Sequence, residues 1–252
     1  MTLGRAAAAG LVAAVILAGM RRPWPDRAAC LRLLAAAVML VACFPGFMAM
    51  AMVTLPASHG AIVLSLLPIA TAICGALILG ERPSLMFWAA SALGALLVLA
   101  FALRGGGALT IGDAYLVIAA ISAAIGYVIS GQAARTMPGW EVICWLLVLS
   151  LPVTLPASVV LFPRDFAAVP ALAWLGFGYA ALFSMLIGFF AWNTGLAMGG
   201  VARVSQVQLL QTFVTVGLAS LVNGETIDTT TWVFTIAVVG AVIMSRLAPV
   251  KR

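Results

Sequence analysis

Polar side chains gather on one face of an apolar stretch near the C-terminal end of the chain, residues 204–222. Five residues form this stripe: Ser205, Gln208, Gln211, Thr212 and Thr215. At 100° per residue of an α-helix they fall within an arc of about 120°. Amides and hydroxyls both donate and accept hydrogen bonds. The chemistry that the stripe favours is noncovalent recognition of a polar solute.

The stripe has two interpretations, because a polar face inside hydrocarbon avoids lipid. It either bonds to a neighbouring helix, at about 0.6–2 kcal/mol per pair, or lines a wet cavity. Two glutamines on one stripe favour the cavity. Trp192 and Asn193 on the preceding apolar stretch add a stacking face and an amide, and Tyr127 adds a phenol. For each of these three alone, packing or interfacial anchoring is the ordinary role.

Residues for covalent chemistry are scarce. A hydrolase or transferase needs a nucleophile–base pair or a metal cluster. The chain has one histidine, His59, and four isolated cysteines, without a GxSxG or HExxH motif. Glu81 and Glu225 fall in turns between apolar stretches, where a structural role is expected. We expect no enzymatic activity, no catalytic residue, no cofactor, no metal and no disulfide.

The composition sets the environment in which these residues must work. Of 252 residues, 65% are hydrophobic and 8% charged, and the mean hydropathy is +1.20. A water-soluble chain is about half apolar and a quarter charged, so lipid must be the solvent here. The net charge of +6 is spread thinly over the loops, which indicates membrane topology and excludes nucleic-acid binding.

Nine apolar stretches predict nine transmembrane helices joined by short links. They cover residues 6–20, 31–51, 60–79, 86–103, 112–133, 140–162, 171–197, 204–222 and 231–247. Most approach the roughly 20 residues that cross the hydrocarbon core as a helix. The alternating pattern of a membrane β-barrel is missing. The fold class is therefore all-α, a polytopic transmembrane helical bundle.

Basic residues orient these helices. Counting the spans alternately places ten of the 13 lysine and arginine residues on one side: Arg21, Arg22, Arg27, Arg32, Arg82, Arg135, Arg203, Arg246, Lys251 and Arg252. The other side holds Arg5, Arg104 and Arg164. Because positive loops stay in the cytoplasm, the C-terminus is predicted to be cytoplasmic.

The chain contains an internal repeat. Segments 58–81 and 202–225 align without gaps, so that Gly80-Glu81 matches Gly224-Glu225. By the span count the two glutamates face opposite sides, which makes the halves inverted, as in secondary transporters. We predict one repeat over residues 1–105 with four helices and a second over 106–252 with five. The counterpart of helix 112–133 would precede residue 1, so we expect the native protein to have a further first helix.

Several motifs carry a family resemblance. They are Leu66-Leu67-Pro68, Gly80-Glu81-Arg82-Pro83, Gly94-Ala95-Leu96, Gly112-Asp113, Ala191-Trp192-Asn193, Leu210-Gln211 and Gly224-Glu225. Together they resemble EamA-like exporters of the drug/metabolite transporter superfamily. The resemblance implies two inverted five-helix repeats and export of amino acids, drugs, nucleosides or other metabolites. Thr212 stands where the family usually has a proline.

The predicted function combines these features. No acidic or basic residue lies near the middle of a predicted span, which favours a neutral, zwitterionic or hydrophobic solute over a strongly ionic one. We expect an EamA-like secondary transporter of the bacterial inner membrane that exports such a metabolite by alternating access. Its partners would be a small-molecule substrate and the lipid bilayer, and the sequence leaves open whether two copies form a homodimer. The alternative is a non-transporting scaffold or accessory subunit.

Two further features concern helix shape. Pro68, Pro152 and Pro156 fall inside predicted helices, where proline removes a backbone hydrogen bond and favours a kink. Ser122, Gly126 and Ser130 are spaced by four and form a small-residue face. Such faces let helices approach closely in membranes, so we predict that this one serves packing.

Overall fold

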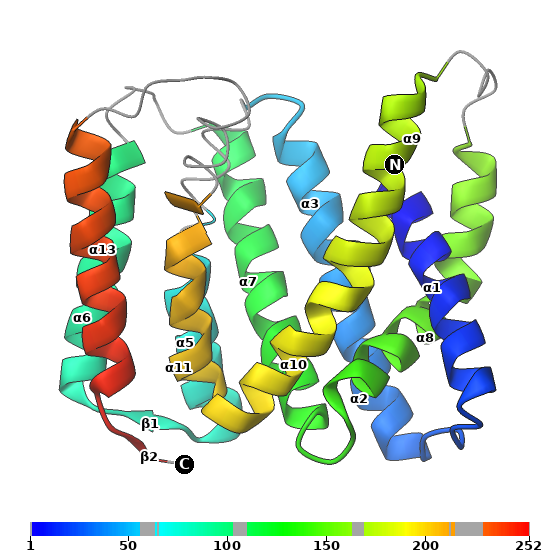
Figure 1. Ribbon diagram of the computed structural model, residues 1–252, viewed down its shortest axis with the longest axis horizontal. Helices are drawn as coiled ribbons and strands as arrows, with labels where there is room; N and C mark the ends of the chain where they lie inside the picture. The colour runs from blue at the N-terminus through cyan, green and yellow to red at the C-terminus, as the bar shows by residue number, and fades with distance from the viewer. Residues whose placement is uncertain are drawn as a thin grey trace. The chain divides into compact units, whose positions relative to one another are not determined.

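The computed structural model describes residues 2–55, 64, 66–102, 110–162, 169–211, 213–214 and 229–251, nearly all of them helical (Figure 1). The α-helices are α1 (Thr2–Gly19), α2 (Arg27–Ala37), α3 (Phe44–Ala51), α5 (Leu67–Leu79), α6 (Leu85–Ala102), α7 (Ile111–Ala133), α8 (Gly139–Val160), α9 (Ala171–Tyr179), α10 (Gly188–Gly199), α11 (Val201–Ser205) and α13 (Thr229–Leu247). Two π-helical segments, η1 (Val38–Cys43) and η4 (Ala180–Ile187), and the 3₁₀-helix η5 (Gln206–Leu210) continue α-helices. The all-α class is confirmed.

Four of the described helices are long and apolar enough to cross a membrane: Arg27–Ala51, Ile111–Ala133, Gly139–Val160 and Ala171–Gly199. Shorter apolar helices cover Leu3–Gly19, Leu67–Leu79, Leu85–Leu97 and Trp232–Ser245. Large aliphatic side chains point outward, and Leu77 is 80% and Leu85 84% exposed. An apolar outer surface of this kind suits contact with lipid tails rather than water.

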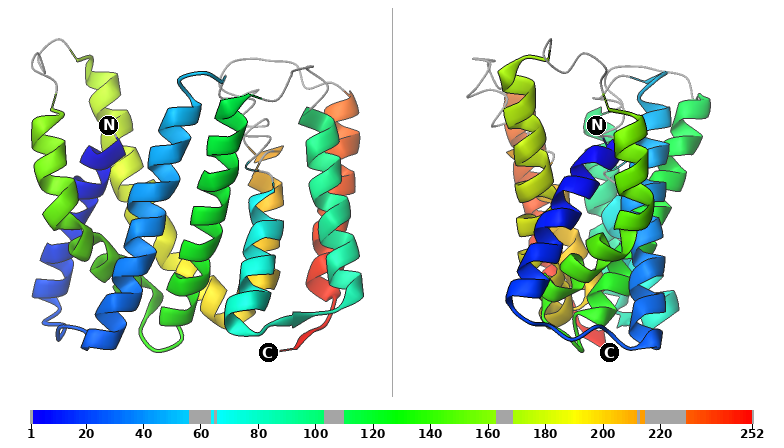
Figure 2. Two further views of the ribbon diagram at one scale, coloured as in Figure 1. Left: turned by 180° about the vertical axis from the view of Figure 1, so that it is seen from behind. Right: turned by 90° about the vertical axis from the view of Figure 1, so that its right-hand side faces the viewer.

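The chain divides into two compact units that each draw on both halves of the sequence. Unit 1 comprises Met1–Gly46 and Ile125–Met198. Within it α1 packs most extensively on α8, and both lie side by side in two views (Figure 2). A Cβ atom at Gly10 would come within 2.8 Å of Leu151 Cδ2, so the missing side chain permits this approach.

Unit 2 comprises Phe47–Ala124 and Gly199–Arg252. Here α13 packs on α6, and α11 packs on α5. Leu209, Phe213, Val238 and Val242 form an aliphatic and aromatic core. The short strands β1 (Arg82–Pro83) and β2 (Val250–Lys251) pair antiparallel and tie the end of the chain to the α5–α6 turn.

The most extensive helix pairs are those that the predicted repeat makes equivalent. By order within each half, α1 corresponds to α8, α5 to α11 and α6 to α13, and each pair packs together. The stretches predicted as helices 31–51 and 171–197 also correspond, and each contains a π-helical segment. The repeat boundary near residue 105 lies outside the described residues and stays a prediction.

The shape predictions have mixed outcomes. Pro68 lies in the first turn of α5, where a missing N–H interrupts no bond of that helix; most of the predicted helix before it, residues 60–63 and 65, lies outside the described residues, so the kink stays a prediction. Pro152 and Pro156 lie inside α8 as predicted. The packing role of Gly126 is confirmed, because a Cβ atom there would lie 2.5 Å from Leu40 Cγ.

Candidate functional site

The predicted polar stripe begins on a helix that changes its winding. After α11 ends at Ser205, the chain tightens into the 3₁₀-helix η5 over Gln206–Leu210. Three residues per turn bring positions i and i+3 into line, so Ser205, Gln208 and Gln211 align more closely than 100° per residue predicts. Thr212 and Thr215 lie outside the described residues.

Of the two roles that the sequence allows for the stripe, Ser205 has the first, hydrogen bonding to a neighbouring helix. Its side chain is fully buried, and Ser205 Oγ lies within hydrogen-bond distance of Pro68 O at 3.2 Å and Ala202 O at 2.9 Å. The contact with Pro68 O links the end of α11 to the start of α5. Ser205 therefore stabilises helix packing, which is the ordinary use of a hydroxyl in a membrane interior.

Gln206 is a buried polar residue that the predicted stripe does not include. Its side chain is 0% exposed, and its Nε2 donates to Pro68 O at 3.3 Å. On an α-helix it lies 100° from Ser205, so an argument from one face of the helix passed over it. The available signal was simply an amide in an apolar run, since such groups are expensive in a membrane.

The two predicted glutamines differ in surroundings. Gln208 is partly buried, and its Oε1 has no hydrogen-bond partner among the described residues. The side chain of Gln211 is exposed. Gln208 thus offers an acceptor in an apolar setting, whereas the side chain of Gln211, directly after η5, is accessible from outside unit 2. Whether both line a cavity stays a prediction.

The three candidates in unit 1 come from α7 and α10. The rings of Tyr127 and Trp192 meet edge to face with centroids 5.4 Å apart, and Phe189, which sequence reasoning missed, lies 6.1 Å from Tyr127. Trp192 Nε1 is buried and has no partner within the described chain. This aromatic cluster provides an apolar surface with one free N–H donor.

Asn193 points to a different neighbour, because it lies 100° further around α10 than Trp192. It is 0% exposed, and its Nδ2 donates to Gly139 O at the start of α8, at 3.3 Å. Its Oδ1 finds no partner in the described part of the structure. The structure therefore joins Tyr127 to Trp192 and directs Asn193 to α8.

Glu81 is buried and caps a helix far away in the sequence. It is 3% exposed, and its two carboxylate oxygens accept from Val201 N at 3.1 Å and Ala202 N at 2.9 Å. The first N–H groups of a helix lack partners within it, and a carboxylate there satisfies them and suits the helix dipole. This geometry is the structural role expected of Glu81; Glu225 lies outside the described residues.

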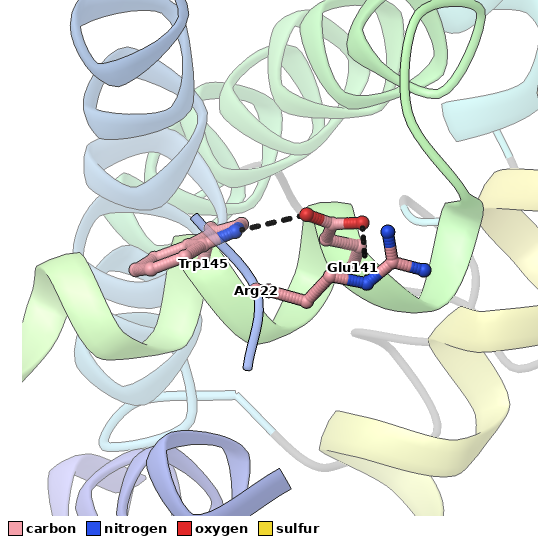
Figure 3. A network of polar contacts seen from close by, with 3 residues as sticks. All are labelled: Arg22, Glu141 and Trp145. Atoms are coloured by element: carbon pink, nitrogen blue, oxygen red, sulfur yellow. Dashed lines mark hydrogen bonds and ion pairs between the residues drawn. The ribbon is translucent and has the colours of Figure 1, made fainter. Parts of the chain in front are cut away.

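Glu141 lies in the first turn of α8, within the polar network of Figure 3. Glu141 Oε2 lies 3.5 Å from Arg22 Nε, and Oε1 accepts from Trp145 Nε1 at 3.3 Å. The Arg22 guanidinium also lies over the ring of Trp140, 5.2 Å from its centroid. The carboxylate is thus partnered by one cation and one indole N–H.

Asp113 in the first turn of α7 is also partnered. Its Oδ2 accepts from Thr110 N at 2.6 Å and from Thr110 Oγ1 at 3.0 Å. Glu81, Asp113 and Glu141 therefore each have hydrogen-bond partners at the ends of helices. Carboxylates placed in this way stabilise helix ends and links between helices.

Comparison with known proteins identifies the family. The sequence pattern of the EamA-like transporter family matches residues 1–103 and 110–247. A Bacillus subtilis (strain 168) protein named "Uncharacterized transporter YdeK" is 41% identical over 247 residues, which are 98% of this chain and 86% of that protein. A solved crystal structure of a protein superposes with a TM-score of 0.78 at 15% identity, over 98% of this chain and 87% of the other, and supports the fold alone. This multi-pass membrane chain therefore belongs to the EamA-like transporter family, within the drug/metabolite type of transporter.

Proposed function

We propose that this transporter exports a small neutral, zwitterionic or hydrophobic metabolite across the bacterial inner membrane by alternating access. The observation that carries the proposal is the pairing of equivalent helices within each unit: α1 with α8, α5 with α11, and α6 with α13. Two related halves that pack in this way can exchange inward-open and outward-open shapes. A scaffold has no need of such pairing.

The partners of three buried carboxylates support the proposed solute class. Glu81 is bound by backbone amides, Asp113 by Thr110 and Glu141 by Arg22 and Trp145. Each carboxylate therefore already has partners within its own unit. Recognition by the remaining polar groups relies on amides and an indole N–H, which suit a neutral or zwitterionic molecule better than a strongly ionic one.

The candidate binding residues are those with polar atoms in apolar surroundings. They are Gln208, Gln211, Thr212, Thr215, Trp192, Asn193 and Tyr127. Gln208 Oε1 and Trp192 Nε1, both without partners among the described residues, support the choice of these two. Tyr127 supports Trp192 through the edge-to-face contact.

The proposed orientation places the C-terminus in the cytoplasm. Arg82 and Lys251 lie opposite each other in the β1–β2 pair. Arg203 Nη2 donates to Ala248 O, just after the C-terminal end of α13 and three residues before Lys251. Basic residues collected at the end of helices favour the cytoplasmic side. A cysteine introduced at Lys251 should react with impermeant maleimide only after the membrane is opened.

A counterflow assay in proteoliposomes tests the function. Vesicles preloaded with amino acids, nucleosides or cationic drugs should accumulate the labelled form of at least one solute well above empty vesicles. The Gln208→Leu, Gln211→Leu double variant should lower that uptake about tenfold, since the loss of one buried hydrogen bond is worth about 1–3 kcal/mol. The control, Ser158→Ala, alters an exposed serine that bonds only Leu155 O. If folded protein moved no solute under any gradient, the proposal would be wrong.

A further inference from the structure

The amide of Gln206 has an orientation that its hydrogen bond determines. Nε2 lies 3.3 Å from Pro68 O. A backbone carbonyl only accepts, so the nitrogen and not the oxygen must face it. Oε1 then points elsewhere, and this buried atom has no partner among the described residues. The side chain as a whole is 0% exposed.

Helix packing alone does not account for an amide at this position. Pro68 O belongs to the first turn of α5 (Leu67–Leu79), where the backbone N–H four residues further on is its helical donor, so that carbonyl has a donor without Gln206. A buried acceptor without a partner costs about as much as a tenfold change in an equilibrium constant. An apolar side chain of similar length would avoid this cost. The distinctive contribution of Gln206 is therefore its free carbonyl oxygen.

Other oxygens of unit 2 share this condition. Gln208 Oε1, two residues along η5, is a buried acceptor without a partner in the described chain. Ser91 Oγ on α6 is likewise buried and unpaired there. The segments are adjacent, because a Cβ atom at Gly94, one turn after Ser91, would lie 2.9 Å from Leu209 Cδ1 on η5. Three buried polar atoms without partners among the described residues therefore lie on η5 and on the adjacent α6.

We propose that Gln206 Oε1 is a specificity-determining acceptor that binds a hydrogen-bond donor of the transported solute. The substrate class is then molecules that carry an ammonium, amide N–H or hydroxyl group, and analogues with those hydrogens replaced by methyl groups are rejected. A site with a buried polar group discriminates strongly against a ligand that leaves that group unpaired. This inference rests on the proposed function and narrows its solute.

Matched pairs of probes test the inference on the purified protein. L-leucine is compared with its N,N,N-trimethyl betaine, and adenosine with N6,N6-dimethyladenosine, each pair differing in N–H donors. The half-saturating concentration is read from the rise in melting temperature. In at least one pair the N–H member should bind the wild-type protein about tenfold or more tightly than its methylated partner. Absence of a preference in both pairs overturns the inference.

Two variants assign the preference to its atom. Gln206→Met keeps the side-chain length and removes the acceptor, and should reduce the preference to below about threefold. Ser205→Ala removes the neighbouring buried hydroxyl and leaves the acceptor, so the preference should persist. An undiminished preference in Gln206→Met overturns the assignment. If that variant does not fold, Gln206→Asn, which keeps the amide on a shorter side chain, should retain part of the preference; full retention or complete loss overturns it.

A metal ion is the competing ligand for a carbonyl oxygen. If NaCl raised the melting temperature of the wild-type protein without solute, KCl did not, and Gln206→Met lost the effect, Oε1 would be an ion ligand and the inference would be overturned. The two proposals also fail separately. Counterflow of any solute without a donor preference contradicts only the role of Gln206, whereas no counterflow at all contradicts the proposed function.

Discussion

Among the described residues, unit 1 and unit 2 each contain one fully buried amide that donates to a backbone carbonyl near the start of a helix. In unit 1 Asn193 Nδ2 lies 3.3 Å from Gly139 O, and in unit 2 Gln206 Nε2 lies 3.3 Å from Pro68 O. The two amides differ in their neighbours, because Ser205 Oγ also lies 3.2 Å from Pro68 O. The one hydrogen of that hydroxyl has Ala202 O as a closer acceptor at 2.9 Å, but a hydroxyl can turn to Pro68 O when the Gln206 amide is removed. We therefore expect the amide of unit 2 to contribute less to packing than that of unit 1.

Two buried carboxylates, Glu141 in unit 1 and Glu81 in unit 2, also differ in their partners. In unit 1 Glu141 is balanced by the side chains of Arg22 and Trp145. In unit 2 Glu81 is bound by two backbone amides of α11, about 120 residues further along the chain. Glu141 is thus paired with a cationic side chain, whereas Glu81 caps the backbone of a helix. Four predictions test this comparison.

Removal of the Glu81 cap should have the largest effect. Glu81→Ala leaves the amides of Val201 and Ala202 buried without partners, and hydrogen bonds to a charged group contribute about 1.5–3 kcal/mol each. We expect a loss of about 3 kcal/mol in the free energy of unfolding, measured in mixed detergent micelles. Glu141→Ala in unit 1 is the matched deletion and should cost less. Equal losses would remove the distinction between the two carboxylates.

Close packing gives the second effect. Gly126→Ala in unit 1 places a Cβ atom 2.5 Å from Leu40 Cγ, whereas Gly240→Ala in unit 2 meets nothing within 4 Å. Overpacking costs about 1–3 kcal/mol, and alanine in a helix gains up to about 1 kcal/mol over glycine. The melting temperature should fall for the first variant and rise slightly for the second. A harmless Gly126→Ala would show that α7 does not need this close approach to η1.

Replacement of the two amides tests this expected difference in packing directly. Asn193→Leu leaves Gly139 O without its side-chain donor, so the free energy of unfolding should fall by about 1 kcal/mol. Gln206→Met leaves the Ser205 hydroxyl 3.2 Å from Pro68 O and able to turn towards it, so the free energy of unfolding should change by less than about 0.5 kcal/mol. Chemical denaturation of the two variants side by side gives the difference. A larger loss for Gln206→Met would show that its amide serves packing after all.

The ion pair of unit 1 should have the smallest effect. Arg22 is 37% exposed at the side chain, and a pair of this kind contributes about 0.2–1 kcal/mol and is screened by salt. Arg22→Gln should lower the melting temperature slightly at low ionic strength, and the difference from the wild-type protein should shrink at 1 M salt. Because Trp140 and Trp145 border the pair, their fluorescence reports the same change. A salt-independent loss would indicate that Arg22 acts through packing on Trp140.

The helices could be read from the sequence because their signal is local. Predicted stretches 112–133 and 171–197 correspond to Ile111–Ala133 and to Ala171–Gly199. A helix in lipid must satisfy its own backbone and span a set thickness, so an apolar run bounded by polar residues determines its position. The family motifs are local in the same sense, and they led to the correct family.

Partners of buried polar atoms were decided only by the tertiary structure. The sequence placed Glu81 in a turn, but nothing near it indicates the amides of Val201 and Ala202. It also assumed one regular helix from residue 204, and η5 tightens at Gln206 instead. Both outcomes depend on which helices pack against each other, because a buried donor or acceptor bonds to whatever neighbour the packing brings within about 3 Å. Local sequence determines where helices form in this protein, and long-range packing determines which of their polar atoms remain free.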